Sequence, residues 1–549
     1  MQWMQNYSAL GGNLGLTAIA AVIPILYLFW ALAIKRMKGH LAGSSTLLVL
    51  LIIAILVYHM PVSTAISAAA LGAVTGLVPI GWIILAAVFL YNLMVESGQF
   101  EIFKNSIASV SSDRRIQSLI IAFSFSAFME GVAGQGAPVA VVAAMLIGMG
   151  FAPMTAATIG LIGNTPPVPF GPIGVPTLMM GTVTGLGGAT VARGVGMDMA
   201  ILAIFIPLFM MIVLTRNWRS TVEVLPAILV AGFGFAIPCL LITRFIGPEL
   251  ASVISSGVSL LCMFALMKVW RPQTVWRFAN DTESSAGANV KYTSGQVFRA
   301  WSPFLVLIVI MLIWAIPSFK AFIGNDLKLF LAVPHWPLLD GIVYQVAPVV
   351  AKPAKYAASY RLDYILTPGS AILLVSIICL PILGVSPSKA LQVFGKTFMQ
   401  LRYTFIMLMS VIGIGFLANY SGVSHTLGLA LALYTGMLFP IFSPIIGLIG
   451  TFMTGSVTSS AALFGKLQQV TAGQIGVNQM LTITASVFGS VAGKLISPQS
   501  IAIACGGVGM VGQEPGIFRR IIPYAIMILV FVIVIVLIEA WIVPGIWAW

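Results

Sequence analysis

The sequence predicts an all-α polytopic membrane protein with about 12–14 membrane segments, in two related halves with broken helices and re-entrant hairpins. First, 59% of its 549 residues are hydrophobic and 7% are charged, whereas a soluble domain carries about 25% charged residues. Second, apolar stretches long enough to cross a bilayer recur from Leu14 onward. Third, short segments rich in glycine and proline interrupt the apolar sequence in both halves of the chain. A single membrane-embedded unit is therefore expected.

The basic residues lie in short clusters between the apolar stretches, although the net charge is +13. The clusters are Lys35-Arg36-Lys38, Arg114-Arg115, Arg216 with Arg219, Lys268 with Arg271 and Arg277, and Arg519-Arg520. This is the positive-inside pattern of membrane proteins, so nucleic acid is not an expected partner. The four cysteines, which have no paired spacing, are expected to be small buried hydrophobic residues.

The order of apolar spans and basic clusters predicts the orientation of the first part of the chain in the membrane. The first span, about 14–34, precedes the cluster at Lys35, so the N-terminus is expected outside and the cluster in the cytoplasm. Spans at about 47–58 and 66–94 then lead to a polar segment that ends at Arg115, again on the cytoplasmic side. No cleavable signal peptide is expected, because the first 13 residues lack a basic region and the first span has full length.

The chain divides into a first transmembrane half, residues 1–270, a cytoplasmic linker, 271–299, and a second half, 300–549. The first half contains a hairpin at 116–150, a broken segment at 163–176 with five prolines, and ordinary spans at about 224–243 and 250–270. The second half contains spans at about 301–316, 364–383, 403–420 and 521–543, and broken segments at 454–461 and 493–509. The mixed segment 317–362 is expected outside, although its five basic residues fit the positive-inside rule badly.

The break at 130–138 carries the sharpest functional signal. An apolar run meets Glu130 and then a group of glycines before Pro138. Backbone can leave the helix at membrane depth only where protein or a water-filled cavity shelters it. An intramembrane acid is a functional-site hypothesis by default, and burial would favour the protonated form of Glu130, which suits a proton carrier. The alternatives are a purely structural acid and glycines that serve close helix packing.

The second half offers hydroxyls and a cation at its breaks. Residues 454–460 hold five hydroxyl side chains around Gly455, which fit a carboxylate- or hydroxyl-binding tip, although hydroxyls also bond back to their own helix. Lys494, just before Ser497-Pro498-Gln499, is the natural counter-charge, with snorkelling to an interface as the alternative. In the first half, Asn164-Thr165 is either a polar ligand pair or an ordinary helix cap.

Paired interruptions in two halves are typical of secondary transporters, whose discontinuous helices meet near the midplane and form the substrate site. Helix N-termini there attract anions. A channel is disfavoured because no filter or ring signature appears. An enzyme is disfavoured because the four histidines show neither metal-ligand spacing nor a nucleophile–base pair. Neither a cofactor nor a metal is predicted.

Several motifs resemble the bacterial L-lactate permease family over nearly the whole chain. They are EGVAGQGAPVA at 130–140, NTPPVPFGPIGVP at 164–176, ANYSG at 418–422, TGSVTSSAALF at 454–464 and GKLISPQSIAIACGGVGMVG at 493–512. The resemblance implies a symporter of the bacterial inner membrane that takes up lactate, and often glycolate, together with a proton. It also implies a relation to transporters with inverted repeats, helical hairpins and an elevator-like movement, commonly as dimers.

The chain departs from the family pattern at three positions. Gln135 stands where an aromatic residue is usual, Val457 where an aspartate is frequent, and Ala461 where an asparagine is frequent. The missing second acid leaves Glu130 as the main candidate for proton coupling. Gln135 makes the site more polar, which would shift the preference among short hydroxy acids.

We therefore expect a proton-coupled importer of L-lactate, glycolate and D-lactate, with the lipid bilayer as its environment and a homodimer as a candidate assembly. Glu130 would carry the proton. The candidate substrate-binding residues are Gly134, Gln135, Gly136, Asn164, Thr165, Gly455, Ser456, Thr458, Ser459, Ser460, Lys494, Ser497 and Gln499. The alternatives are a sodium-coupled carboxylate transporter and a membrane carboxylate receptor.

Overall fold

The computed structural model describes residues 2–35, 37–108, 111–134, 137–278, 292–510 and 513–547. It is mainly helical, and 11 helices in these ranges are long and apolar enough to cross a membrane. Three shorter apolar helices accompany them, at Pro138–Gly148, Pro153–Gly163 and Pro368–Leu383. The prediction of an all-α polytopic membrane protein is confirmed.

The helices before residue 270 are α1 Leu14–Phe29, α2 Gly39–Leu56, α3 Val62–Thr75, α4 Trp82–Glu96, α5 Gln99–Ala108, α6 Arg114–Ser118, α7 Ser126–Val132, α8 Ala137–Gly148, α9 Pro153–Gly163, α10 Val175–Thr184, α11 Gly188–Thr215, α12 Trp218–Val222, α13 Leu225–Phe245 and α14 Ala251–Val269. The later helices are α15 Ser294–Ala315, α16 Pro317–Ala321, α17 Pro368–Leu383, α18 Pro387–Ser421, α19 Val423–Thr435, α20 Phe439–Thr454, α21 Val457–Ile475, α22 Gln479–Ile496, α23 Pro498–Gly507 and α24 Glu514–Leu537.

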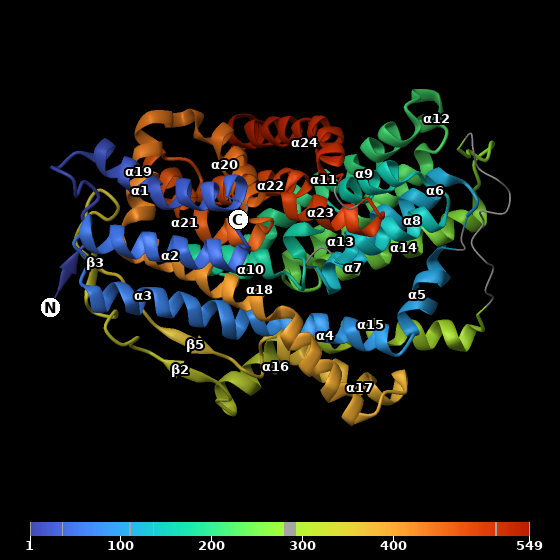
Figure 1. The fold of residues 1–549 in the computed structure, drawn as a ribbon, viewed down its shortest axis with the longest axis horizontal. Helices are drawn as coiled ribbons and strands as arrows, with labels where there is room; N and C mark the ends of the chain where they lie inside the picture. The colour runs from blue at the N-terminus through green and yellow to red at the C-terminus, as the bar shows by residue number, and fades with distance from the viewer. Residues whose placement is uncertain are drawn as a thin grey trace.

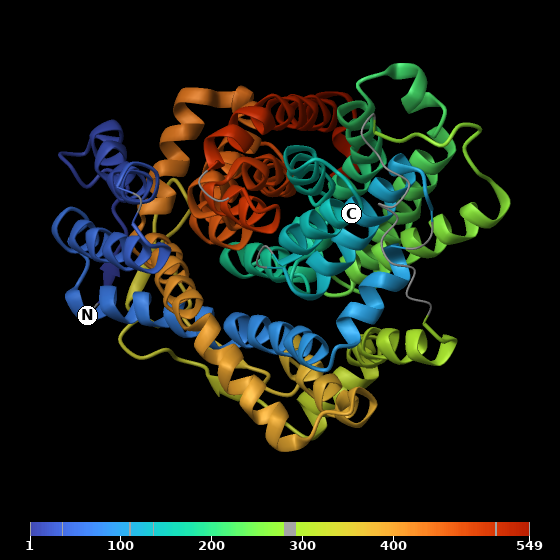
Figure 2. The ribbon, with the colours of Figure 1, turned by 45° about the vertical axis from the view of Figure 1, so that its right-hand side comes forward.

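Helices α1 to α4 and α18 form one side of the molecule, where α18 packs against α2, α3 and α4. On the other side, α7 to α14 pack with α20 to α24, through contacts such as α11 with α22 and α8 with α23. Figure 2 shows the two groups, with the blue helices and the long orange α18 along the left and the bottom and the teal and red helices toward the upper right. Helix α18 also contacts α21, so it links the groups.

Helix α18 is longer than the sequence analysis predicted. The expected span was about 403–420, whereas the helix runs for 35 residues from Pro387 to Ser421. The first part of the helix is rich in polar helix formers, so it is not apolar enough to be recognised as a membrane span. The side chain of the N-cap Ser386 accepts a hydrogen bond from the Lys389 amide, which stabilises the start of the helix. Hydropathy detects the apolar core of a membrane helix but not its polar extension.

Five short strands, which hydropathy did not predict, lie in the half of the molecule that holds the N-terminus (Figure 1). In one sheet, β3 Val343–Gln345 pairs in parallel with β1 Trp3–Met4 and antiparallel with β4 Ala354–Lys355. In the other, β2 Leu331–Val333 pairs antiparallel with β5 Tyr360–Leu362. This pairing joins the N-terminal residues to the segment 343–345.

The opposite end is held by a buried arginine. Arg115 is fully buried and donates hydrogen bonds to Asp113, to Glu223 (2.9 Å) and to the carbonyl of Thr274 (2.8 Å). The hydrogen bond from Arg115 lowers the pKa of Glu223 to about 2. Arg115 thereby joins the segments near α6, α12 and residue 274, which the charge pattern assigned together to the cytoplasmic side.

Helices stop and restart at the glycine- and proline-rich breaks. Helix α9 ends at Gly163 and α10 begins at Val175, with a 3₁₀ turn, Val168–Phe170, between them. Helix α20 ends before Gly455, whose φ of 68° is in the left-handed region that favours glycine, and α21 begins two residues later. Likewise α22 and α23 are separated by Ser497. These ends surround the candidate site.

Candidate functional site

A small internal cavity lies where the helix ends meet. Its volume is about 90 Å³, well below the roughly 300–1,000 Å³ of pockets for drug-sized ligands. Helices α7, α18, α21, α22 and α23 and the connection before α10 contribute to its wall. The lining residues are Glu130, Val168, Gly171, Pro172, Pro176, Thr404, Met407, Leu408, Gly455, Ser456, Val457, Thr458, Ser459, Lys494 and Gln499.

Glu130 is held in place by an amide rather than by a cation. The side chain is 4% exposed, and its Oε2 accepts a hydrogen bond of 2.9 Å from Asn164 Nδ2. Asn164 in turn accepts a hydrogen bond from Ser126 Oγ (2.8 Å), which fixes the orientation of the amide. The described residues therefore give Glu130 one hydrogen-bond donor and no ion pair.

The backbone at Gly171 leaves room for the Glu130 side chain. A Cβ atom at position 171 would lie 2.8 Å from Glu130 Cγ and 2.9 Å from Oε1, closer than real Cβ atoms approach other atoms. A glycine is therefore required at position 171, where the connection between α9 and α10 passes the carboxyl group of Glu130. The proline-rich segment thus shapes the acidic side of the cavity.

Lys494 supplies the positive charge on the other side. It lies in the last turn of α22, and its Nζ donates a hydrogen bond of 2.8 Å to the Gly455 carbonyl. The side chain is partly exposed because it borders the cavity, and it interacts electrostatically with Glu130 without a direct ion pair. The ammonium group is therefore held at the wall of the cavity by the Gly455 carbonyl.

Three helix N-termini reach the same cavity. Ser456 is the N-cap of α21, and its Oγ accepts a hydrogen bond from the Ser459 amide (3.3 Å). Gln499 lies in the first turn of α23, and Pro176 in the first turn of α10. Unpaired amide groups and the helix dipole make such termini favourable for an anion. The cavity can therefore hold a small anion between an acid and an ammonium group.

Seven of the candidate residues line the cavity: Glu130, Gly455, Ser456, Thr458, Ser459, Lys494 and Gln499. Asn164 lies behind Glu130, and Gly134, with φ of 53°, packs against Pro172. Thr165, Ser460 and Ser497 instead direct their hydroxyls to the carbonyls of Ile162, Gly447 and Lys494. Gln135 and Gly136 lie outside the described residues.

Sequence reasoning missed the contribution of α18. Thr404, Met407 and Leu408 line the cavity from a helix that the sequence analysis treated as an ordinary span. They recur at helical spacing, but no local signal distinguishes this face from a lipid-facing one. Sequence reasoning also missed two intramembrane acids, Asp198 and Glu539. Both lie within apolar stretches of the sequence, which is a signal that could have revealed them.

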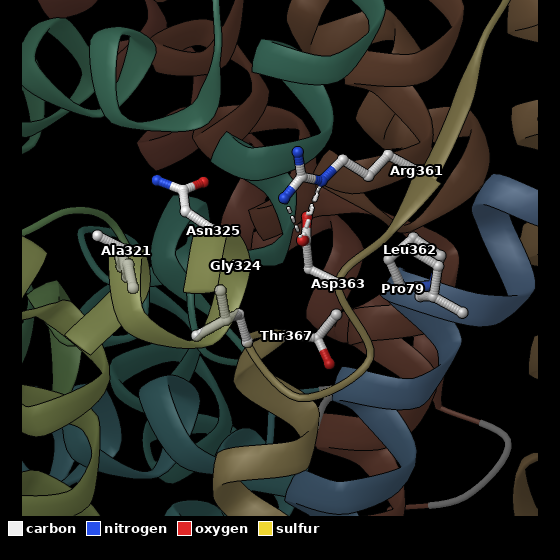
Figure 3. Close-up of a pocket in the computed structure, with 10 residues that line it drawn as sticks. Pro79, Ala321, Gly324, Asn325, Arg361, Leu362, Asp363 and Thr367 are labelled. Atoms are coloured by element: carbon white, nitrogen blue, oxygen red, sulfur yellow. Dashed lines mark hydrogen bonds and ion pairs between the residues drawn. The ribbon is translucent and has the colours of Figure 1, made fainter. Parts of the chain in front are cut away.

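A larger pocket of about 590 Å³ lies elsewhere, at the 317–367 segment (Figure 3). Arg361 lines this pocket and forms an ion pair of 2.8 Å with Asp363, which lines the same pocket. The pocket shares no residue with the cavity at Glu130. Arg361 is neutralised by this aspartate, and the exposed Lys320 also lines the pocket.

Comparisons with known proteins agree on one family. The family model described as L-lactate permease matches residues 17–543. The L-lactate permease of Bacillus subtilis is 43% identical over 565 residues, which cover 99% of this chain and 100% of that protein. The L-lactate permease of Escherichia coli K12 is 43% identical over 551 residues, covering 99% and 100%. The glycolate permease GlcA of the same organism is 43% identical over 560 residues, covering 99% of each.

Among solved structures, the YdaH transporter of Alcanivorax borkumensis aligns with 86% of each chain, at 12% identity and a TM-score of 0.44. Family membership rests on the sequence matches, which extend over almost the whole length of this chain and of its relatives. The protein is therefore a multi-pass membrane transporter that belongs to the L-lactate permease family.

Proposed function

We propose that the protein imports short 2-hydroxymonocarboxylates, L-lactate above all, together with a proton across the cytoplasmic membrane. Glycolate and D-lactate would share the site. The observation that carries the proposal is the cavity that both Glu130 and Lys494 line and that three helix N-termini reach. Relatives named L-lactate permease and glycolate permease support this substrate class.

The cavity suits a small carboxylate in charge and in size. The substrate carboxylate would bind at the N-terminus of α21 and to the ammonium group of Lys494, which would exchange its hydrogen bond with Gly455 for one with the substrate. The hydroxyls of Ser456, Thr458 and Ser459 would recognise the 2-hydroxyl group. A volume of about 90 Å³ restricts the site to molecules of a few non-hydrogen atoms.

Glu130 would carry the coupled proton. With the anion bound beside it, an ionised Glu130 would repel the substrate, so the acid would be protonated when the substrate is bound. The loaded cavity would then hold one negative substrate, one positive lysine and a neutral acid. Release of the substrate inside the cell would let Glu130 return its proton to the cytoplasm.

Uptake of labelled L-lactate into vesicles that contain the purified protein tests the proposal. We expect accumulation above the equilibrium level under an inward proton gradient and no accumulation under a sodium gradient at fixed pH. Unlabelled glycolate and D-lactate should compete. Accumulation that needs sodium would favour a sodium-coupled carrier, and binding without accumulation under either gradient would favour a receptor.

A further inference from the structure

A pair of acids lies inside the membrane region, away from the cavity. Asp198 is on α11, and Glu539 is in the π-helical turn Ile538–Ile542 that follows α24. The C-terminal segment that follows Glu539 packs on α11 one turn before Asp198, where a Cβ atom at Gly194 would lie 2.8 Å from the Trp547 ring, and the two carboxyl groups are close enough to interact electrostatically. Asp198 is 0% exposed and Glu539 is 3% exposed, so both carboxyl groups are shielded from water.

Neither carboxyl group has a hydrogen-bond donor within the described ranges. All four oxygens of Asp198 and Glu539 are buried without a hydrogen-bond partner. Thr484 of α22 is near Asp198, but its hydroxyl donates to the Leu481 carbonyl (3.2 Å). Unpartnered buried carboxylates are costly, which indicates that the pair binds something that supplies a hydrogen-bond donor or a positive charge.

The charged and titratable side chains on the surrounding helices do not supply that charge. On α11, Arg193 is exposed to the surroundings. On α13, Arg244 is exposed and Cys239 contacts the Gly196 carbonyl. On α22, Lys494 faces the other cavity, ten residues from Thr484, which is about 15 Å along the helix axis.

We propose that Asp198 and Glu539 form a second proton-binding site, in which the two carboxyl groups share one proton. Two neighbouring carboxylates cannot both remain ionised in a low-dielectric environment. A single proton taken from water converts the pair into a carboxylic acid that donates a hydrogen bond to a carboxylate. The pair then holds one negative charge instead of two, and a charge-assisted O–H···O hydrogen bond of the strong class forms between them.

The local structure brings the pair together. π-Helical turns occur frequently at functional sites, and here such a turn carries Glu539. A Cβ atom at Gly194 would lie 2.6 Å from Thr484 Cγ2 and 2.8 Å from the Trp547 ring, so α11 approaches α22 and the C-terminal segment closely there. This close approach holds the C-terminal segment against α11 near Asp198.

A metal ion fits the site less well than a proton. The described residues contain no group of three or more His, Cys, Asp or Glu side chains that could hold a metal ion. Hard cations require more oxygen ligands, about six to eight for calcium, than two carboxyl groups and one nearby hydroxyl provide. Sodium remains the competing occupant that the experiment has to separate from a proton.

Infrared spectroscopy of the purified protein in lipid tests the proposal without any substrate, so its result is independent of the transport reaction. We expect a protonated-carboxyl band near neutral pH in the wild type and in Glu130→Gln, and loss of that band in the double variant Asp198→Asn/Glu539→Gln. The amides keep the size of the side chains and can still hydrogen-bond to each other. A band that is unchanged in the double variant would overturn the proposal.

The Glu130→Gln protein supplies a second measurement if the double variant does not fold. Raising the pH should remove the band and lower the thermal stability, because two adjacent charges then repel each other, and sodium chloride should not replace the effect of the proton. Loss of the band at neutral pH on addition of sodium, but not of potassium or choline, would identify a sodium site and overturn the proposal.

Discussion

At the scale of single residues, the candidate site depends on two isolated charged residues in apolar sequence. Glu130 and Lys494 could be selected from the sequence because ionisable residues are rare in membrane segments, and the structure places both on one cavity. Thr404 and Met407 could not be selected in the same way, because nothing in the sequence of α18 shows which face turns toward the hairpins. An isolated charge can be recognised in the sequence itself, whereas the apolar and hydroxyl residues that line the cavity are determined by tertiary packing.

Gly171→Ala should impair transport, because the new Cβ would meet the backbone oxygen and the side chain of Glu130 at 2.6–2.9 Å. Overpacking of this kind costs about 1–3 kcal/mol, and we expect a reduction of uptake by about tenfold or more. Gly257→Ala on α14 is the matched control, because its Cβ would meet nothing within 4 Å. Equal uptake by the two variants in vesicles would contradict the role given to Gly171.

Lys494→Met should weaken substrate binding by removing a hydrogen bond to a charged group, worth about 1.5–3 kcal/mol, or roughly tenfold to a hundredfold in affinity. Competition binding with labelled lactate measures this effect. Lys466→Met serves as the control, because Lys466 binds Gln469 and does not line the cavity. Comparable losses in both variants would show that charge in general, rather than the position of Lys494, matters.

At the scale of secondary-structure elements, apolar stretches predicted the membrane helices well, but short strands escaped the sequence analysis. Strands β1 and β3 have two and three residues and lie about 340 positions apart in the chain, at Trp3 and Val343. Such short strands have no periodicity of their own, and they form because distant parts of the fold bring them together. The Gly- and Pro-rich breaks were visible because these residues act locally on the backbone.

The tip between α20 and α21 provides a prediction at this scale. Gly455→Ala would place a methyl group against Gln499, closest to the amide oxygen Oε1 and then to Cβ at 2.9 Å and Cδ at 3.1 Å, and would strain a residue with φ of 68°. Gly476→Ala strains a similar φ of 73° but meets nothing within 4 Å. We expect Gly455→Ala to lose lactate binding and Gly476→Ala to retain it, although both lose some thermal stability.

A double variant separates the clash from the backbone strain. Gln499→Ala combined with Gly455→Ala removes much of the clash, so it should recover part of the thermal stability lost by Gly455→Ala alone. A double-variant cycle based on thermal unfolding measures this coupling. Strictly additive losses would mean that the contact between the two tips contributes nothing.

At the scale of the whole molecule, Arg115 ties together three segments at the end opposite the N-terminus. Arg115→Met would leave Asp113, which is 2% exposed, without its partner. Removal of one member of a buried ion pair costs about 3–5 kcal/mol, so we expect a large drop in the unfolding temperature in detergent at neutral pH. Arg219→Met, which changes an exposed arginine at the same end, is the control.

The loss caused by Arg115→Met should depend on pH. The pKa of Glu223 is lowered to about 2 by Arg115, so the stability from this pair is complete above the unfolded-state pKa, about 4.3. It declines as the pH falls from there toward 2, where Glu223 becomes protonated. The difference in unfolding temperature between the wild type and Arg115→Met should therefore shrink below pH 4, and a constant difference would contradict the assignment.

The proposed function places substrate and proton in one cavity, and the Glu130→Gln variant in vesicles tests this proposal most directly. Glutamine keeps the size of the side chain and its contact with Asn164 but cannot exchange a proton. We predict that the variant loses accumulation of L-lactate driven by a proton gradient, yet still exchanges labelled for unlabelled lactate across the membrane. Unchanged proton-driven accumulation by Glu130→Gln would contradict the account.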